Sequence, residues 1–293
     1  MTPPKPPLKI LMLHGYTQSG TLFYNKTRAL TKHLQKSFPL HDVSFSYPTG
    51  PRRLNPDDIP GYDSTNNNND QNQEQEQDKP EAYSWWRISR ASNPPEYIGL
   101  ENGLETVAKV LRTEGPFDGV IGFSQGAALA AMVASLLEPG RKEAFEYFTD
   151  AKIASDGLGL QENVAGIPFP ESFVSENVSH PPLKFALCYS GFRAPGPRYR
   201  GFYERPAIQT PVLHVLGSLD SVVDEGRSRS LIEACAGEPE KEGKVVWHPG
   251  GHFLPSQRTY LDAAVLFIRK SLEGQTEKGP QAEERVEDMD VPF

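Results

Sequence analysis

Residues 119–134 read GVIGFSQGAALAAMVA, and this stretch decides the fold. A short apolar run at 119–121 suits a buried strand, and residues 127–134 are strong helix formers. Ser124 therefore lies at a tight strand-to-helix turn with a glycine two residues away on either side. Such a turn strains the backbone of its central residue and brings two chain segments close together, so both flanking residues need to be glycine. The serine hydroxyl is then held at the N-terminus of a helix, where the dipole favours developing negative charge.

A serine nucleophile needs a base, and the base needs a carboxylate to orient it. Of the seven histidines, His248 and His252 follow the apolar stretch 244–247. His252 is the expected base because two glycines give it a flexible loop and a helix at about 256–270 follows it. The other five histidines are expected in structural or surface positions, and they are His14, His33, His41, His180 and His214. Of these, His14 is expected to shape the loop that follows the first strand.

The expected carboxylate is Asp220, which lies in a loop of small residues just after the apolar stretch 212–216. This is where the acid that fixes the imidazole tautomer belongs. Asp224 is the alternative, although it begins the next helical stretch and suits a helix N-cap equally well.

Negative charge developing on a substrate oxygen needs hydrogen-bond donors aimed at it. The backbone N–H of Gln125, the residue after the serine, is one expected donor. The second should come from the loop 14–20, which follows an early strand at 8–13, and the Tyr16 amide is our choice. The alternative is that this loop is an ordinary strand-to-helix turn.

These motifs resemble the fungal family of serine hydrolases (FSH type), a branch of the α/β-hydrolases that is also similar to the carboxylesterases and acyl-protein thioesterases. The matching segments span about residues 8 to 271, and they are 9–20, 84–86, 115–128, 189–192 and 250–255. The resemblance implies a triad of Ser124, Asp220 and His252, in agreement with the choice made from the residues. It also implies cleavage of carboxylic esters or thioesters. In several family members it implies release of a polyketide acid from a carrier protein in secondary metabolism.

Strands and helices alternate along the chain, which predicts an α/β fold with a mostly parallel central sheet and helices on both faces. The expected strands lie at 8–13, 42–47, 119–121, 184–189, 212–216 and 244–247, and the expected helices at 22–35, 97–112, 127–134, 225–236 and 256–270. The resemblance makes this an α/β-hydrolase domain over residues 8–271, preceded by an N-terminal extension at 1–7. Residues 66–78 hold Asn, Gln and acids without an apolar residue and predict a disordered loop. Residues 272–293 predict a disordered acidic tail.

An insertion at about 139–182 lies where α/β-hydrolases often carry a cap. Two interpretations stay open: a mobile lid that admits an acyl chain, or a passive surface excursion. The first predicts an acyl pocket lined by aromatic side chains, namely Phe145, Phe148, Phe169 and Phe173, with Trp85 and Trp86 on the far side. The second is that these aromatic residues pack in the core.

Composition fits a single-domain enzyme, since 293 residues with 37% hydrophobic content can form a sizeable core. The net charge of −8 comes from two segments, because residues 66–78 contribute −4 and residues 273–293 contribute −5. The rest of the chain is nearly neutral. We therefore expect neither nucleic-acid binding nor strong steering of a charged substrate.

Cysteine content and apolar patterning predict a cytoplasmic protein without a membrane segment. The chain has two cysteines, which argues against a disulfide framework and for a reducing compartment. The first apolar run is too short for a signal peptide, and a run of ~18 apolar residues is absent.

The expected chemistry is acyl transfer through a serine ester intermediate, which needs no metal or organic cofactor. The His and Cys spacings also lack a zinc pattern. The expected partner is a small acyl ester or thioester, and the resemblance adds an acyl carrier protein of a polyketide synthase. A haloalkane dehalogenase is disfavoured because the turn holds serine instead of aspartate. The alternative from another class is a noncatalytic ligand-binding protein on a hydrolase scaffold, although such proteins usually lose part of the triad.

Overall fold

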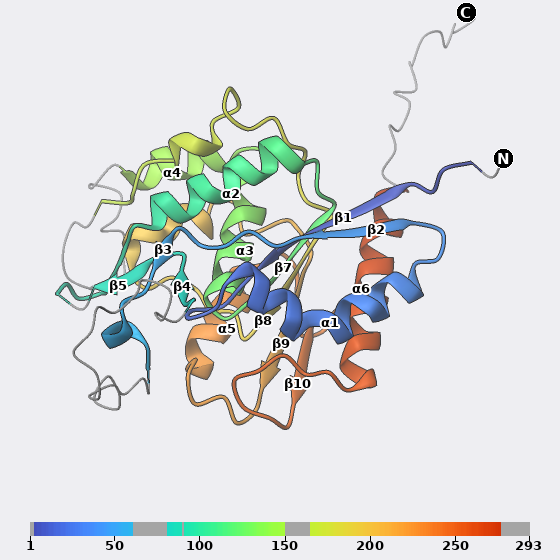
Figure 1. Cartoon of the computed structure of the whole chain (residues 1–293). Coiled ribbons are helices and arrows are strands. Elements are labelled where there is room, and N and C mark those ends of the chain that lie inside the picture. Colours follow the sequence, from blue (N-terminus) through green and yellow to red (C-terminus); the bar gives the residue numbers. More distant parts are fainter. Residues whose placement is uncertain (1–2, 61–80, 90, 150–164, 277–293) are drawn as a thin grey trace, which may run out of the picture.

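The computed structural model describes residues 3–60, 81–89, 91–149 and 165–276. Within these residues six strands form a parallel sheet in the order β10-β9-β8-β7-β1-β2 (Figure 1). The strands are β1 (Pro7–Leu13), β2 (Asp42–Ser46), β7 (Gly119–Phe123), β8 (Phe185–Tyr189), β9 (Val212–Gly217) and β10 (Val245–His248). The predicted parallel sheet is confirmed.

Helices cover both faces of this sheet, as predicted. The helices α1 (Gly20–Ser37) and α6 (Arg258–Thr276) pack on one face, and α2 (Leu100–Glu114), α3 (Gln125–Leu136) and α5 (Glu225–Glu233) pack on the other. Side chains of a strand point alternately to the two faces. In β1, for example, Ile10 and Met12 belong to the core under α1 and α6, whereas Leu11 and Leu13 belong to the core under α2 and α3.

Smaller elements complete the fold. Two short antiparallel pairs are formed by β3 (Arg52–Arg53) with β4 (Tyr83–Ser84), and by β5 (Arg87–Ser89) with β6 (Glu96–Ile98). In the described part of the chain the remaining helices are α4 (Arg141–Thr149) and the 3-10 turns η1 (Pro56–Asp58), η4 (Glu171–Phe173) and η5 (Pro197–Phe202).

Several predicted boundaries shift. The helix expected at 97–112 begins at Leu100, because residues 96–98 pair as β6 and Gly99 has a φ of 81° that ends the strand. The last helix continues to Thr276, beyond the domain end expected at 271. The expected loop at 66–78 and the tail from residue 277 lie outside the described residues.

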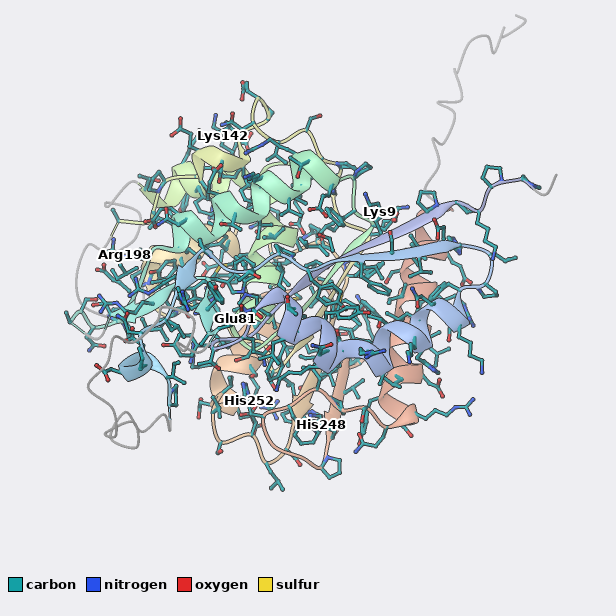
Figure 2. The ribbon with its side chains drawn as sticks, in the orientation of Figure 1. Lys9, Glu81, Lys142, Arg198, His248 and His252 are labelled. Carbon is teal, nitrogen blue, oxygen red and sulfur yellow. The ribbon has the colours of Figure 1, made fainter. Side chains whose placement is uncertain are left out.

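The described part of the 139–182 insertion packs into the body of the protein. Its helix α4 lies against α3 and η5, and Phe145 stacks edge-on to Phe202 with ring centroids 4.8 Å apart. Phe145, Phe148 and Phe173 are buried in this packing. In Figure 2, Lys142 of α4 lies at the opposite side of the molecule from His252. These aromatic residues therefore have the core-packing role, while residues 150–164 lie outside the described part.

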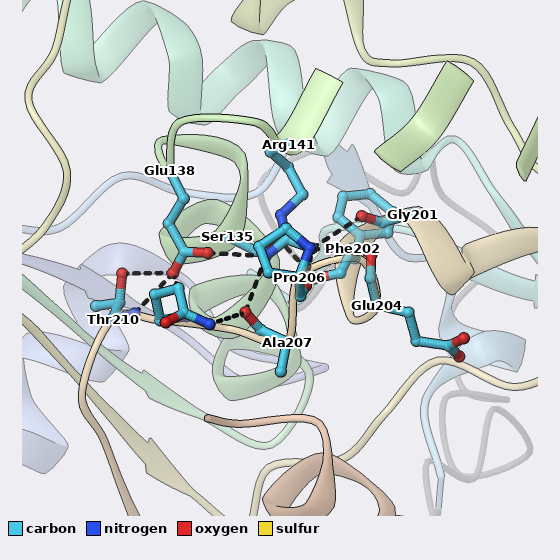
Figure 3. Close-up of polar contacts among 10 residues, drawn as sticks. Ser135, Glu138, Arg141, Gly201, Phe202, Glu204, Pro206, Ala207 and Thr210 are labelled. Atoms are coloured by element: carbon cyan, nitrogen blue, oxygen red, sulfur yellow. Dashed lines mark hydrogen bonds and ion pairs between the residues drawn. The ribbon is translucent and has the colours of Figure 1, made fainter. Parts of the chain in front are cut away.

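A buried ion pair joins the end of α3 to the segment that leads into β9 (Figure 3). The Arg141 guanidinium donates to the Glu138 carboxylate at 2.8 Å and to the carbonyl of Pro206 at 2.7 Å. The second oxygen of Glu138 accepts from the amide of Gln209 at 2.9 Å and from the amide and hydroxyl of Thr210 at 2.7 and 2.8 Å. A buried pair surrounded by such donors and acceptors fixes backbone position more than it adds stability.

The strand order creates a crevice at the carboxyl edge of the sheet. The chain proceeds from β1 outward to β2, then crosses to β7 on the other side of β1 and continues to β10. At such a switch point the loops after the two neighbouring strands diverge, and ligands of open α/β sheets bind there. Here the loop after β1 and the turn after β7 face each other.

A membrane-spanning helix would need a long, continuous apolar stretch, and no helix in the described residues has one.

Candidate active site

Ser124 occupies the turn between β7 and α3 with backbone angles of φ 53° and ψ −117°, a conformation that non-glycine residues rarely adopt. The two neighbouring glycines are required by close approach. A Cβ on Gly122 would lie 2.2 Å from the carbonyl oxygen of Gly126, and a Cβ on Gly126 would lie 2.1 Å from that of Leu13. The glycine spacing around Ser124 predicts this strained turn, and the packing of α3 against β1 enforces it.

The structure brings together the three side chains expected from the sequence. The Ser124 Oγ lies 2.9 Å from Nε2 of His252, and Nδ1 of the same ring lies 2.8 Å from Oδ2 of Asp220. Because a carboxylate accepts, Nδ1 carries the imidazole proton and Nε2 is free to accept the serine proton. The ring of Phe123 packs against the imidazole at 4.9 Å. This geometry can pass a proton from serine to histidine.

Asp220 is held by its own loop. Its other oxygen, Oδ1, accepts hydrogen bonds from the backbone amides of Val222 and Val223, both at 2.9 Å. Burial would raise the pKa of Asp220, but the bonds from Val223, His252 and Val222 outweigh it, and the pKa is lowered. The alternative acid, Asp224, caps α5 by accepting from the Gly226 amide at 2.9 Å.

His14 and His248, although near the same edge of the sheet, are placed differently from His252. His14 is fully buried, and desolvation lowers its pKa to about 4 despite a hydrogen bond to the Gly15 carbonyl. His248 is buried against the rings of Phe253 and Tyr260, and burial lowers its pKa as well. Neither ring has a recorded bond to the Ser124 hydroxyl.

The four remaining histidines make structural contacts. The ring of His41 packs edge-on against Phe38, with centroids 6.0 Å apart. His33 pairs with Asp262 at 2.7 Å and so joins α1 to α6. The ring of His180 accepts from the Phe117 amide at 2.7 Å. His214 is buried inside β9, 3.6 Å from the thiol of Cys235.

The loop after β1 folds into a tight turn. The Gln18 amide donates to the Gly15 carbonyl at 3.2 Å, and the Gln18 side chain accepts from the Gly15 amide at 3.2 Å. Thr17 has a φ of 66° and donates its hydroxyl to the Tyr16 carbonyl at 2.6 Å. The expected donor at Tyr16 therefore lies in a tightly bonded turn. Gln125 is the first residue of α3, where an amide has no acceptor within the helix.

A cavity of about 430 Å³ opens beside Ser124 and His252. Its other walls come from the loop after β1, from α1, and from the loops around the triad, and they include Tyr16, Thr17, Gln18, Lys26, Pro60, Phe123, Val222, Phe253 and Leu254. The volume lies in the range of small-molecule sites, about 300–1,000 Å³. The aromatic residues for which an acyl pocket and core packing were the two open interpretations are absent from this lining, and Trp85 and Trp86 are fully buried. For the described residues this favours the core-packing interpretation.

Sequence reasoning missed several residues of the site. Lys26 belongs to the cavity because the first turns of α1 start at the sheet edge, but an isolated lysine on a polar helix face gives no sequence signal. The side chains of Gln18 and Gln125 were also missed, and both form hydrogen bonds with backbone groups. Phe253 and Leu254 directly follow His252, the expected base. Their position next to it in the sequence is the signal that could have placed them in the site.

Comparison with known proteins assigns the family. Over residues 1–264 the chain matches the family described as serine hydrolase (FSH1). A Schizosaccharomyces pombe protein named dihydrofolate reductase is 32% identical over 254 residues, which cover 87% of this chain and 45% of that protein. Esterase OVCA2 of Danio rerio is 32% identical over 272 residues, which cover 90% of this chain and 97% of that protein.

The crystal structure of Zea mays acyl-protein thioesterase 2 shares the fold, with a TM-score of 0.51 at 20% identity, covering 92% of this chain and 97% of that chain. The present chain spans about half the length of two Schizosaccharomyces pombe relatives but nearly all of esterase OVCA2. A family match that covers most of the chain, together with the shared fold, is sufficient for assignment: the chain belongs to the FSH1 family of serine hydrolases.

Proposed function

We propose that this chain is an esterase or thioesterase that works through a covalent acyl-enzyme on Ser124. The observation that carries the proposal is the pair of contacts at 2.9 and 2.8 Å that link the Ser124 hydroxyl, the His252 ring and the Asp220 carboxylate. The cavity beside the hydroxyl leaves room for a substrate. Serine hydrolase family membership and the esterase name of a relative of similar length support the same activity.

In the proposed reaction His252 takes the Ser124 proton as the hydroxyl attacks the carbonyl carbon. Asp220 holds the imidazole in the required tautomer and stabilises its positive charge. The amides of Tyr16 and Gln125 donate to the oxygen that becomes negative. The alcohol or thiol leaves with a proton from His252, and a water that His252 deprotonates then cleaves the acyl-enzyme.

A fluorophosphonate probe tests the nucleophile. The probe should label wild-type protein and should fail to label Ser124→Ala, while Ser190→Ala, which removes another buried serine at the same sheet edge, keeps the labelling. Absence of labelling in folded wild-type protein would support the ligand-binding alternative instead.

The finer proposal is release of an acyl or polyketide chain from a carrier protein in fungal secondary metabolism, in the cytoplasm. Its support is the family resemblance, together with two buried unpaired cysteines for the location. Turnover should be compared between p-nitrophenyl esters and acyl-pantetheine thioesters of matched acyl length. A preference for the thioesters would favour carrier release, and a preference for the esters would favour a carboxylesterase.

A further inference from the structure

Trp85 lies between the two segments that carry the proposed oxyanion donors. Its side chain is fully buried, and its indole Nε1 donates to the carbonyl of His14 at 2.8 Å. Its own backbone amide donates to the side-chain oxygen of Gln125 at 2.9 Å. The nitrogen of that same Gln125 amide group donates to the carbonyl of Trp86 at 2.9 Å. One residue therefore touches both the end of β1 and the start of α3.

The contacts continue to the Tyr16 amide through His14. The His14 ring lies against the Trp85 indole, with centroids 4.8 Å apart. The Gly50 amide donates to Nε2 of His14 at 2.8 Å, so the ring proton is on Nδ1. That Nδ1 lies 2.8 Å from the Gly15 carbonyl, to which it donates. The lowered pKa of His14 keeps Nε2 unprotonated and able to accept.

Fixing the Gly15 carbonyl also fixes the direction of the Tyr16 N–H. The peptide bond is planar and trans, so the carbonyl oxygen of one residue and the N–H of the next point in opposite directions. The His14 ring and the Gln18 amide hold this carbonyl from two sides. The Tyr16 N–H is therefore aimed by the His14 ring and the Gln18 amide.

We propose that Trp85 is a positioning residue that sets the distance and angle between the Tyr16 and Gln125 amides, through His14 on one side and the Gln125 side chain on the other. This inference rests on the proposed function. Oxyanion donors act only if they point to where charge develops, and small displacements reduce their effect strongly.

The chain offers a matched control in Trp86. Trp86 is equally buried and adjacent, it stacks on Tyr97 at 4.8 Å, and its Nε1 has no hydrogen-bond partner among the described residues. Trp85→Phe and Trp86→Phe each replace one buried indole by a benzene ring. The Trp85 change alone also removes a bond to the loop after β1.

Trp85→Phe should lower kcat by about 10-fold or more while KM stays within about twofold, because the donors act mainly in the transition state. Trp86→Phe should keep kcat near wild type. A trifluoromethyl ketone that mimics the tetrahedral intermediate should lose affinity for Trp85→Phe by the same factor as kcat. Equal kcat for the two variants, or a change confined to KM, would overturn the proposal.

A second measurement does not depend on turnover. Hydrogen exchange of the amides at 15–18 should become faster in Trp85→Phe than in Trp86→Phe, and Gln125→Leu combined with Trp85→Phe should be less than additive. Wild-type protein that hydrolyses neither esters nor thioesters would defeat the proposed function, whereas unchanged exchange in Trp85→Phe would defeat the positioning role.

The charge of the cavity carries a second, independent inference. Lys26 lines the cavity beside Ser124, and among the described lining residues it faces no carboxylate. It forms no ion pair with the described residues, and the whole of α1 contains no Asp or Glu while it also carries Arg28, Lys32 and Lys36. The Asp220 carboxylate already accepts hydrogen bonds from two backbone amides and from the His252 ring. Near the Tyr16 hydroxyl, Asp58 is balanced by Arg52 and Arg87.

We infer that Lys26 gives the site a preference for ester substrates that carry a carboxylate close to the scissile carbonyl. The carboxylate could belong to the acyl group or to the leaving group. A carboxylate on the acyl group is tested by comparing kcat/KM for mono-p-nitrophenyl glutarate with that for p-nitrophenyl valerate. A carboxylate on the leaving group is tested by comparing 4-(butyryloxy)benzoate with its methyl ester.

One of these pairs should show about a fivefold higher kcat/KM for the anionic member, as expected for an exposed charge pair. Lys26→Gln should abolish the preference and Lys26→Glu should reverse it, whereas Lys32→Gln, farther along the same helix, should leave it unchanged. Should Lys26→Gln keep both ratios, the inference fails. Calorimetric binding of monomethyl glutarate against methyl valerate to Ser124→Ala reads the same preference without turnover.

Discussion

Asp220 and Asp224 lie four residues apart, and their carboxylates accept hydrogen bonds from different groups: Asp220 from the His252 ring and Asp224 from the Gly226 amide. Asp220→Asn should lower kcat by about 10³- to 10⁴-fold, because an amide can present an N–H to His252 and stabilise the wrong tautomer. Asp224→Asn should stay near wild type, because asparagine caps a helix as well as aspartate does. Esterase assays of both variants at pH 7–8 measure this. Similar losses in the two would mean that the orienting acid is misassigned.

Gly126 is the residue at which the turn leaves no room for a side chain. In Gly126→Ala the new Cβ would lie 2.1 Å from the Leu13 carbonyl oxygen and 2.4 Å from that of His14, so α3 or β1 must move. We expect a loss of activity of at least ~100-fold with a clear drop in Tm. Gly274→Ala on α6 is the control, since its Cβ meets nothing within 4 Å and alanine favours a helix. Unchanged activity in Gly126→Ala would contradict the strained turn.

At the scale of elements, the buried pair of Glu138 and Arg141 anchors the end of α3 to the segment before β9. Glu138→Gln leaves the Arg141 guanidinium buried without a counter-charge, and the cost should be about 3 kcal/mol. Glu225→Gln removes one of the two carboxylate partners of Arg229, in an exposed pair on α5, and should leave the unfolding midpoint unchanged. Urea unfolding of the two variants measures the difference. Equal midpoints would show that the network in Figure 3 contributes little to the free energy of unfolding.

How far the sequence predicts an element depends on how local its cause is. The turn at Ser124 follows from Gly122, Gly126 and the apolar runs around them, so it is predictable from adjacent residues. The walls of the cavity cannot be predicted from adjacent residues, because Lys26 and Val222 come together only through the order of the strands. The aromatic residues of α4 left two roles open, since apolar spacing on a helix predicts a buried face but not what that face packs against.

At the scale of the whole molecule, buried histidines make stability depend on pH. Desolvation lowers the pKa of His14 to about 4 and, with a contribution from Lys244, that of His214 to about 3, from 6.5. The unfolded chain therefore binds more protons than the folded protein between about pH 6.5 and 4. The free energy of unfolding should fall as pH is lowered through this window.

Tm measured from pH 7 to 4.5 tests this expectation, and His214→Leu should flatten the curve by up to one proton, about 1.4 kcal/mol per pH unit. The lowered pKa of Asp220 acts below this window, because its stabilisation is lost only as the carboxylate is protonated. A Tm that is level down to pH 4.5 would show that these rings take up protons in the folded protein as readily as in the unfolded chain.

The lining of the site comes mainly from loops after strands and from α1, and only Phe123 and Leu254 belong to or pack against one of the two cores. Changes at Lys26 and Val222, both exposed, are thus separated from the positions that hold the sheet together. A library randomised at these two positions should retain a high fraction of soluble, folded members, which makes this scaffold suited to laboratory evolution of new ester selectivities.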